Sequence, residues 1–106
     1  MDIQTVTPFI KRYIQNINEH IKVSSVLLYG SLAEKRTTET SDIDLLVLSE
    51  DFTKLDPDER SKLLYRSSVG FPYDLHVYGV TFDELQHASP LTTLGKIKQG
   101  KTIHIQ

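Results

Sequence analysis

The chain has 106 residues, 39% hydrophobic content and a formal net charge of −2. This length predicts a single domain, residues 1–106, with room for one substantial core. The weak negative charge argues against a dedicated nucleic-acid-binding domain, which normally carries a basic stripe. The absence of cysteine excludes disulfides and zinc–thiolate sites. Without a signal-peptide pattern or an apolar run of about 20 residues, we expect a cytoplasmic protein with no membrane association.

The first half of the chain predicts one helix and two strands. Apolar residues recur every three or four positions over residues 3–21, which predicts an amphipathic helix with one face on the core. Residues 23–29 predict a strand that ends at Gly30. Residues 43–48 predict a second strand that is apolar on both faces, and so central and covered by helices.

The second half predicts three helices and two further strands. Asp56 and Glu59 form a capping-box pattern that begins a helix running to about residue 66. A strand follows over residues 73–80, and then a short helix from Thr81 to about residue 87. A last helix opens at residues 89–90 and stops near residue 100, before a short edge strand at 102–105. This alternation predicts an α+β, or layered α/β, fold: a mixed β-sheet with helices packed on it.

The segment from Gly30 to Asp44 carries the strongest functional signal. Gly30 and Ser31 close the first predicted strand, and Asp42 and Asp44 open the second. Side chains at positions i and i+2 of a strand lie on the same face, so the two carboxylates should project together. Two adjacent carboxylates repel each other unless a cation lies between them, and Mg²⁺ is the usual cation where phosphate is also bound.

These residue types suit the transfer of a nucleotide. Glycine lets the backbone approach phosphates, and a serine hydroxyl beside a helical turn can hold phosphate oxygens. Asp74, which interrupts an apolar and aromatic run, is the candidate third carboxylate of a two-metal site. Asp42 and Asp44 could instead merely cap a turn. His76 shares the face of Asp74 and could contact an acceptor, or be a partly exposed histidine of the sheet.

The run from Leu28 to Ser31, followed ten residues later by Ser41 to Val47, resembles the minimal nucleotidyltransferase domains of the DNA polymerase beta superfamily. The resemblance covers nearly the whole chain and implies a nucleotidyltransferase-like fold. It implies that Gly30 and Ser31 bind the nucleotide phosphates. It also implies that two Mg²⁺ ions are held by Asp42, Asp44 and the third carboxylate, Asp74, which helps to activate the acceptor.

The resemblance further implies transfer of a nucleoside monophosphate, AMP by preference, from an NTP such as ATP to a hydroxyl. It implies a small all-helical HEPN-type protein as partner, with this chain as the antitoxin of a toxin–antitoxin pair, or else a homodimer. The family often has an arginine and then a glycine where this chain has Glu34 and Lys35. One alternative hypothesis is therefore a non-catalytic antitoxin module that keeps the fold, and another is a small-molecule nucleotidyltransferase subunit.

Overall fold

A computed structural model describes residues 2–36 and 42–106 of the chain. The elements follow in the order α1 (Ile3–Asn18), β1 (Ser25–Tyr29), α2 (Gly30–Ala33), β2 (Ile43–Leu48), the 3₁₀ helix η1 (Glu50–Lys54), α3 (Pro57–Ser67), β3 (Leu75–Val80), α4 (Phe82–Gln86), α5 (Thr93–Gln99) and β4 (Ile103–His104). The predicted order of helices and strands is confirmed, and the ends of most elements differ from the prediction by one or two residues.

The four strands form one mixed sheet in the order β3-β2-β1-β4. Strand β1 pairs antiparallel with both β2 and β4, whereas β2 and β3 run parallel. Strand β2 is central, as its apolar character on both faces predicted, and all of its residues except Asp44 are buried. The predicted mixed sheet with helices packed on it is therefore correct.

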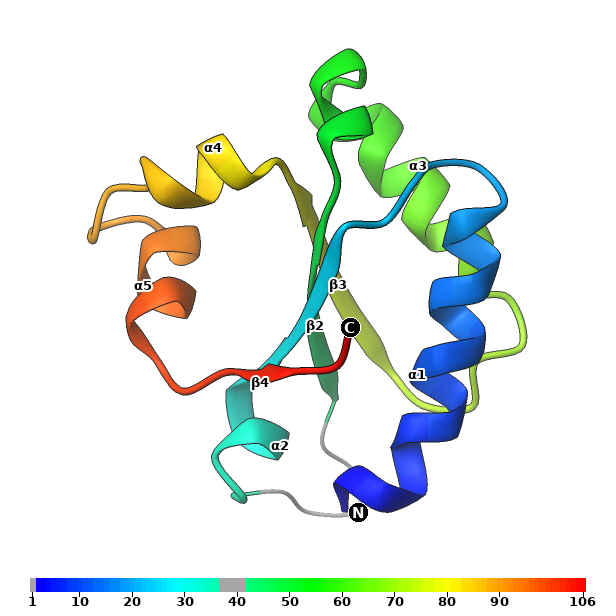
Figure 1. The fold of residues 1–106 in the computed structure, drawn as a ribbon. Helices are drawn as coiled ribbons and strands as arrows, with labels where there is room; N and C mark the ends of the chain where they lie inside the picture. Colours follow the sequence, from blue (N-terminus) through cyan, green and yellow to red (C-terminus); the bar gives the residue numbers. More distant parts are fainter. Residues whose placement is uncertain (1, 37–41) are drawn as a thin grey trace.

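Helices cover both faces of the sheet. Helices α1 and α3 lie on one side, and α4 and α5 lie on the other, as Figure 1 shows. The larger apolar core lies between the sheet and α1 with α3, and a smaller core joins the second half of β2 to α5 through Leu46, Leu48 and Ile97. Because the smaller core begins at Leu46, the side chains of α5 do not cover the start of β2. That arrangement leaves Asp44 half-buried at the border of the smaller core.

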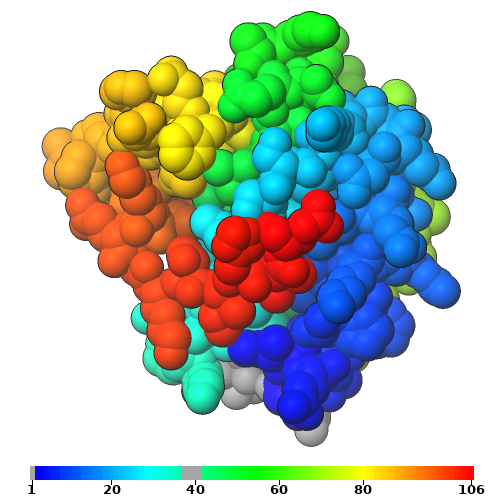
Figure 2. All heavy atoms as spheres, viewed as in Figure 1, coloured from blue at the N-terminus to red at the C-terminus, as the bar shows by residue number. Residues whose placement is uncertain are grey.

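The chain ends on the sheet. Strand β4 adds to the edge of β1 through the pairs Leu27–His104 and Leu28–Ile103. Figure 2 shows these last residues lying across the front of the molecule, between α1 and α5. The predicted edge strand is confirmed, although it is only two residues long.

Both predicted capping boxes are present. The Asp56 carboxylate accepts from the N–H of Glu59 at 2.8 Å, and the Glu59 carboxylate accepts from the N–H of Asp56 at 3.1 Å. Thr81 and Glu84 make the same reciprocal pair at the start of α4. Each pair satisfies two backbone donors that a helix start leaves without partners, which is why these local patterns predicted the helix starts correctly.

Two features of the fold differ from the prediction. The 3₁₀ helix η1 was not predicted; Ser49 caps it, and its Phe52 is fully buried. Helix α5 begins at Thr93 and not at Ser89, because Thr92 provides the N-cap and accepts from the N–H of Gly95. A Cβ at Gly95 would lie 1.9 Å from the carbonyl oxygen of Ser89, so the preceding turn packs directly on this glycine.

No helix in residues 2–36 and 42–106 combines the length and the apolar character that crossing a bilayer would need.

Candidate functional site

The turn between β1 and β2 places Gly30 directly against Asp44. Gly30 has φ of +75°, a conformation that side chains disfavour. A Cβ at this position would also lie 2.3 Å from Oδ2 of Asp44. Glycine is therefore required for two separate reasons, backbone conformation and close approach. Ser31, in the first turn of α2, is half-buried beside this contact.

Asp42 and Asp44 lie at the start of β2, as predicted. The sheet register sets Tyr29, Asp44 and His76 in one row across β1, β2 and β3. Asp42 precedes the strand by one residue and, by strand alternation, lies on the same face as Asp44. Burial raises the pKa of Asp44; the charge of His76 opposes this rise, and the like charge of Asp42 adds to it. The ionised carboxylate is thus held where a cation would stabilise it.

His76 contacts the first of the two carboxylates. Its Nε2 lies 2.7 Å from Oδ2 of Asp42, and both side chains remain accessible, with exposed fractions of 62% and 40%. The contact is diagonal, because the residue paired with His76 in the register is Asp44 and not Asp42. Strand alternation predicted that His76 shares the face of Asp74, but the contact with Asp42 was not predicted.

Asp74 lies at the edge of the same region. Its carbonyl oxygen accepts from the N–H of Ile43 at 2.8 Å, which joins the approach to β3 to the start of β2. Its side chain is exposed, two residues before His76. Within residues 2–36 and 42–106, no three carboxylate or imidazole side chains are gathered closely enough to hold one ion. The structure thus brings Asp42 into contact with His76 and sets Asp44 beside His76 in the sheet register, whereas Asp74 lies just before β3.

The segment after Ser31 shows where Glu34 points. Its carboxylate pairs with the Arg36 guanidinium at 2.7 Å, and both side chains are well exposed. Lys35 has φ of +58° and ends the short helical turn. An exposed pair of this kind contributes little to stability, but it neutralises the carboxylate that stands where the family often has arginine. Ser41, which belongs to the predicted motif, lies outside the described residues.

Two tyrosines on this face were not predicted to belong to the site. Tyr29 is half-buried at the end of β1, and burial raises the pKa of its phenol, with smaller contributions from Asp44 and Tyr78. Tyr78 is 48% exposed on β3, two residues after His76. The period of two along β3 was the signal that could have placed Tyr78 on the face of His76 and Asp74. The site therefore has an aromatic border as well as its carboxylates.

Comparisons with known proteins confirm the predicted nucleotidyltransferase-like fold. The family model for the nucleotidyltransferase domain matches residues 10–99. A proposed nucleotidyltransferase from Sulfolobus solfataricus has a TM-score of 0.70 at 15% identity, covering 94% of this chain and 78% of that chain. A toxin–antitoxin structure with AMP-PNP has a TM-score of 0.64 at 23% identity, covering 91% and 71%.

A third similar structure is that of tri-AMPylated Shewanella oneidensis HEPN toxin in complex with MNT antitoxin. Its TM-score is 0.60 at 19% identity, and the match covers 97% of this chain and 71% of that chain. Likeness at such identities shows the fold alone. None of the curated proteins matches the chain. The family match, which spans most of the sequence, establishes that this chain belongs to the nucleotidyltransferase domain family.

Proposed function

We propose that this chain transfers AMP from ATP to a hydroxyl group of a small all-helical partner protein, and that it thereby acts as the antitoxin of a toxin–antitoxin pair. The observation that carries the proposal is the close approach of Gly30 to Asp44, which joins the phosphate-binding type of turn to a half-buried carboxylate. The partner is suggested by the similar structures, which include toxin–antitoxin complexes and an AMPylated HEPN toxin.

The carboxylates suit a divalent cation. Asp44 is half-buried beside the like charge of Asp42, and oxygen ligands of this kind are what Mg²⁺ prefers. Two Mg²⁺ ions would be held by Asp42 and Asp44 with Asp74, and they would neutralise the triphosphate and the charge that develops on it. His76 contacts one oxygen of Asp42, and the other oxygen of that carboxylate would remain for an ion.

The remaining roles fall on residues of the turn and of β3. In the proposed reaction the backbone at Gly30 and the hydroxyl of Ser31 hold the triphosphate. Asp74, exposed at the sheet edge, takes the proton of the acceptor hydroxyl. The acceptor oxygen then forms a bond to the α-phosphorus, the bond from that phosphorus to the bridging oxygen breaks, and pyrophosphate leaves.

The test is transfer of label from α-³²P-ATP, with Mg²⁺, to a purified small all-helical HEPN-type protein from the same source. The proposal predicts label on that protein with the parent chain and none with Asp42→Asn/Asp44→Asn. Label transfer that survives the double substitution would overturn the assigned site. If the parent chain neither transfers label nor binds ATP and Mg²⁺, the proposal that it is an enzyme is overturned.

A second candidate is a non-catalytic antitoxin that neutralises its partner by contact. It is favoured by one observation, the carboxylate of Glu34 close after the glycine turn. The two functions are separated by thermal unfolding with ATP and Mg²⁺, because a ligand that binds the native state raises the apparent stability. If the chain is an enzyme, its Tm should rise with ATP concentration. If it neutralises its partner by contact alone, its Tm should not change.

A further inference from the structure

Helices α1 and α3 lie side by side on the face of the sheet opposite the carboxylates. The Tyr13 hydroxyl donates to the carbonyl of Leu64 at 2.9 Å, and the Asn16 amide donates to the carbonyl of Ser67 at 3.2 Å. Two hollows follow each other along this seam, with volumes of about 130 and 380 Å³. We call the pair the α1–α3 groove.

The smaller hollow is largely apolar and aromatic. Its walls include Phe9, Phe71 and Val69, with Arg12 at its rim. Val69 is 80% exposed and Phe9 is 38% exposed, so the apolar surface here meets solvent. The rings are held in place, because Phe71 packs on Tyr13 with ring centroids 5.9 Å apart. A preformed hollow of this size suits one large apolar side chain.

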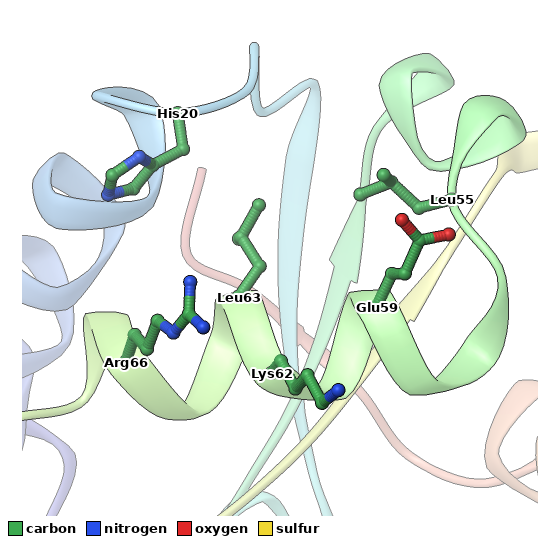
Figure 3. A pocket seen from close by; sticks show the side chains of 6 residues that line it. All are labelled: His20, Leu55, Glu59, Lys62, Leu63 and Arg66. Atoms are coloured by element: carbon green, nitrogen blue, oxygen red, sulfur yellow. The ribbon is translucent and has the colours of Figure 1, made fainter.

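The larger hollow continues the groove by one helical turn. On α3, Leu63 lines the larger hollow and Ser67, four residues later, lines the smaller one; His20, in the turn just after α1, closes the larger hollow on the other side. Figure 3 shows His20 and Arg66 at one end of this hollow and Glu59 and Leu55 at the other, with Leu63 between them. The hollow thus has apolar side chains in its lining, together with basic groups and one carboxylate.

The groove is basic in a chain whose net charge is −2. Its formal cations are Arg12, Lys62 and Arg66, and its carboxylate is that of Glu59. The Glu59 carboxylate accepts from the N–H of Asp56 in the capping box. Lys62 pairs with Asp58 at 3.1 Å, whereas Arg12 and Arg66 form no ion pair with any residue that the structure describes. Two guanidinium groups therefore remain to meet acidic groups of a partner.

We propose that the α1–α3 groove docks an acidic amphipathic helix of the small all-helical partner, an inference that rests on the proposed function for the identity of that partner. A helix fits a seam between two helices, and it presents side chains one turn apart to hollows one turn apart. One large apolar side chain enters the smaller hollow, and carboxylates one turn along the bound helix pair with Arg12 and Arg66.

This docking position leads toward the candidate active site. Pro72 lines the smaller hollow, and Asp74 follows two residues later. Between them, Tyr73 packs edge-on against Phe9, with ring centroids 5.8 Å apart. A segment that continues from the docked helix past this aromatic pair arrives at the edge of β3 where Asp74 is exposed. Because the groove and the pair Asp42 and Asp44 lie on opposite faces of the sheet, that segment would have to pass around the β3 edge at Asp74 to bring its acceptor hydroxyl to them.

The experiment measures, by titration calorimetry, binding of the same purified small all-helical HEPN-type protein that serves in the transfer assay. The test variant is Arg12→Glu/Arg66→Glu, and Val69→Asp tests the apolar hollow separately. Lys96→Glu/Lys101→Glu, two exposed lysines at the end of α5 and just beyond it, is the control with the same change of charge. All four substituted side chains of the two double variants are exposed, so the fold should persist, and binding of ATP and Mg²⁺ checks it.

The expected result is a dissociation constant raised about tenfold or more by each groove variant and within about twofold of the parent for the lysine control. Equal weakening by the groove and control variants, or no weakening by the groove variants, overturns the proposal. So does a parent chain that binds no such helical protein, or a groove variant that only dissociates a homodimer. Binding of ATP and Mg²⁺ by the parent chain tests the nucleotide site independently of all these outcomes.

Discussion

Gly30 and Asp44 approach so closely that a single added carbon would separate them: a Cβ on Gly30 would lie 2.3 Å from Oδ2 of Asp44. The two residues come from different elements, α2 and β2, and the register that pairs Tyr29 with Asp44 brings them together. The turn and the carboxylate therefore form one unit. Any substitution that moves the turn also moves a carboxylate of the proposed metal site.

Gly30→Ala should destabilise the fold and abolish ATP binding. The positive φ alone costs about 1–2 kcal/mol, and the contact with Asp44 adds to it. Gly70→Ala is the matched control, because Gly70 also has a positive φ, of +88°, but nothing lies within 4 Å of its Cβ position. Chemical denaturation should give a larger loss of unfolding free energy for Gly30→Ala. Equal losses would show that the contact with Asp44 has no energetic consequence.

Asp44→Asn should raise the Tm of the chain in EDTA by a few degrees while it abolishes nucleotide transfer. The neutral amide removes a half-buried charge and its repulsion with Asp42, both of which disfavour the ionised carboxylate. Asp42→Asn is the comparison, since Asp42 contacts His76 and its substitution removes a favourable partner. Thermal unfolding of the three proteins in EDTA provides the measurement. A lower Tm for Asp44→Asn than for the parent would show that the Asp44 carboxylate does not destabilise the metal-free fold.

Arg60→Met should be one of the more damaging single substitutions in the chain. The Arg60 side chain is 13% exposed and donates to the carbonyls of Phe52, Leu55 and Gly79 and to the Glu84 carboxylate. It also lies over the Phe52 ring, 5.5 Å from the centroid. It thus ties α3 to η1, β3 and α4.

The loss of these bonds should cost about 3 kcal/mol of unfolding free energy, because three partly buried carbonyls each lose a charged donor. Lys62→Met on the same helix is the control. Lys62 forms an exposed pair with Asp58, so its loss should change the free energy by less than about 0.5 kcal/mol. Urea denaturation of both variants tests the prediction, and similar costs for the two would refute the role of Arg60.

Acidification should weaken the contact between Arg60 and Glu84. The hydrogen bond from Arg60 holds the pKa of Glu84 below its ordinary value of 4.5. A carboxylate whose pKa is lower in the folded state stabilises the fold above its unfolded pKa, and this contribution is lost as pH falls through the folded pKa. The unfolding free energy of the parent should therefore fall more steeply below about pH 4.5 than that of Glu84→Gln. Glu50→Gln, at an exposed position, should keep the slope of the parent.

Much of the fold could be predicted from short stretches of sequence. The apolar period of α1, the capping boxes at Asp56 and Thr81, and the doubly apolar β2 are local patterns, and each predicted its element correctly. The η1 helix was missed because its reason is not local: Phe52 is buried against Gly79, where a Cβ would lie 2.6 Å from the ring. The start of α5 was wrong because the Ser89–Pro90 turn packs against Gly95, a contact that no propensity describes.

Some features of the candidate site could likewise be predicted from local sequence, and others could not. The sequence by itself determined the glycine turn and the pair of carboxylates on one face, because turn chemistry and strand alternation depend on near neighbours. The family was indicated by the resemblance of the whole motif and was established by the match over residues 10–99. Only the tertiary structure decided that Asp42 meets His76, that Glu34 pairs with Arg36 and that Asp44 lies under Gly30. These contacts depend on strand register and on the rotamers of exposed side chains, which the order of residues does not specify until the sheet has formed.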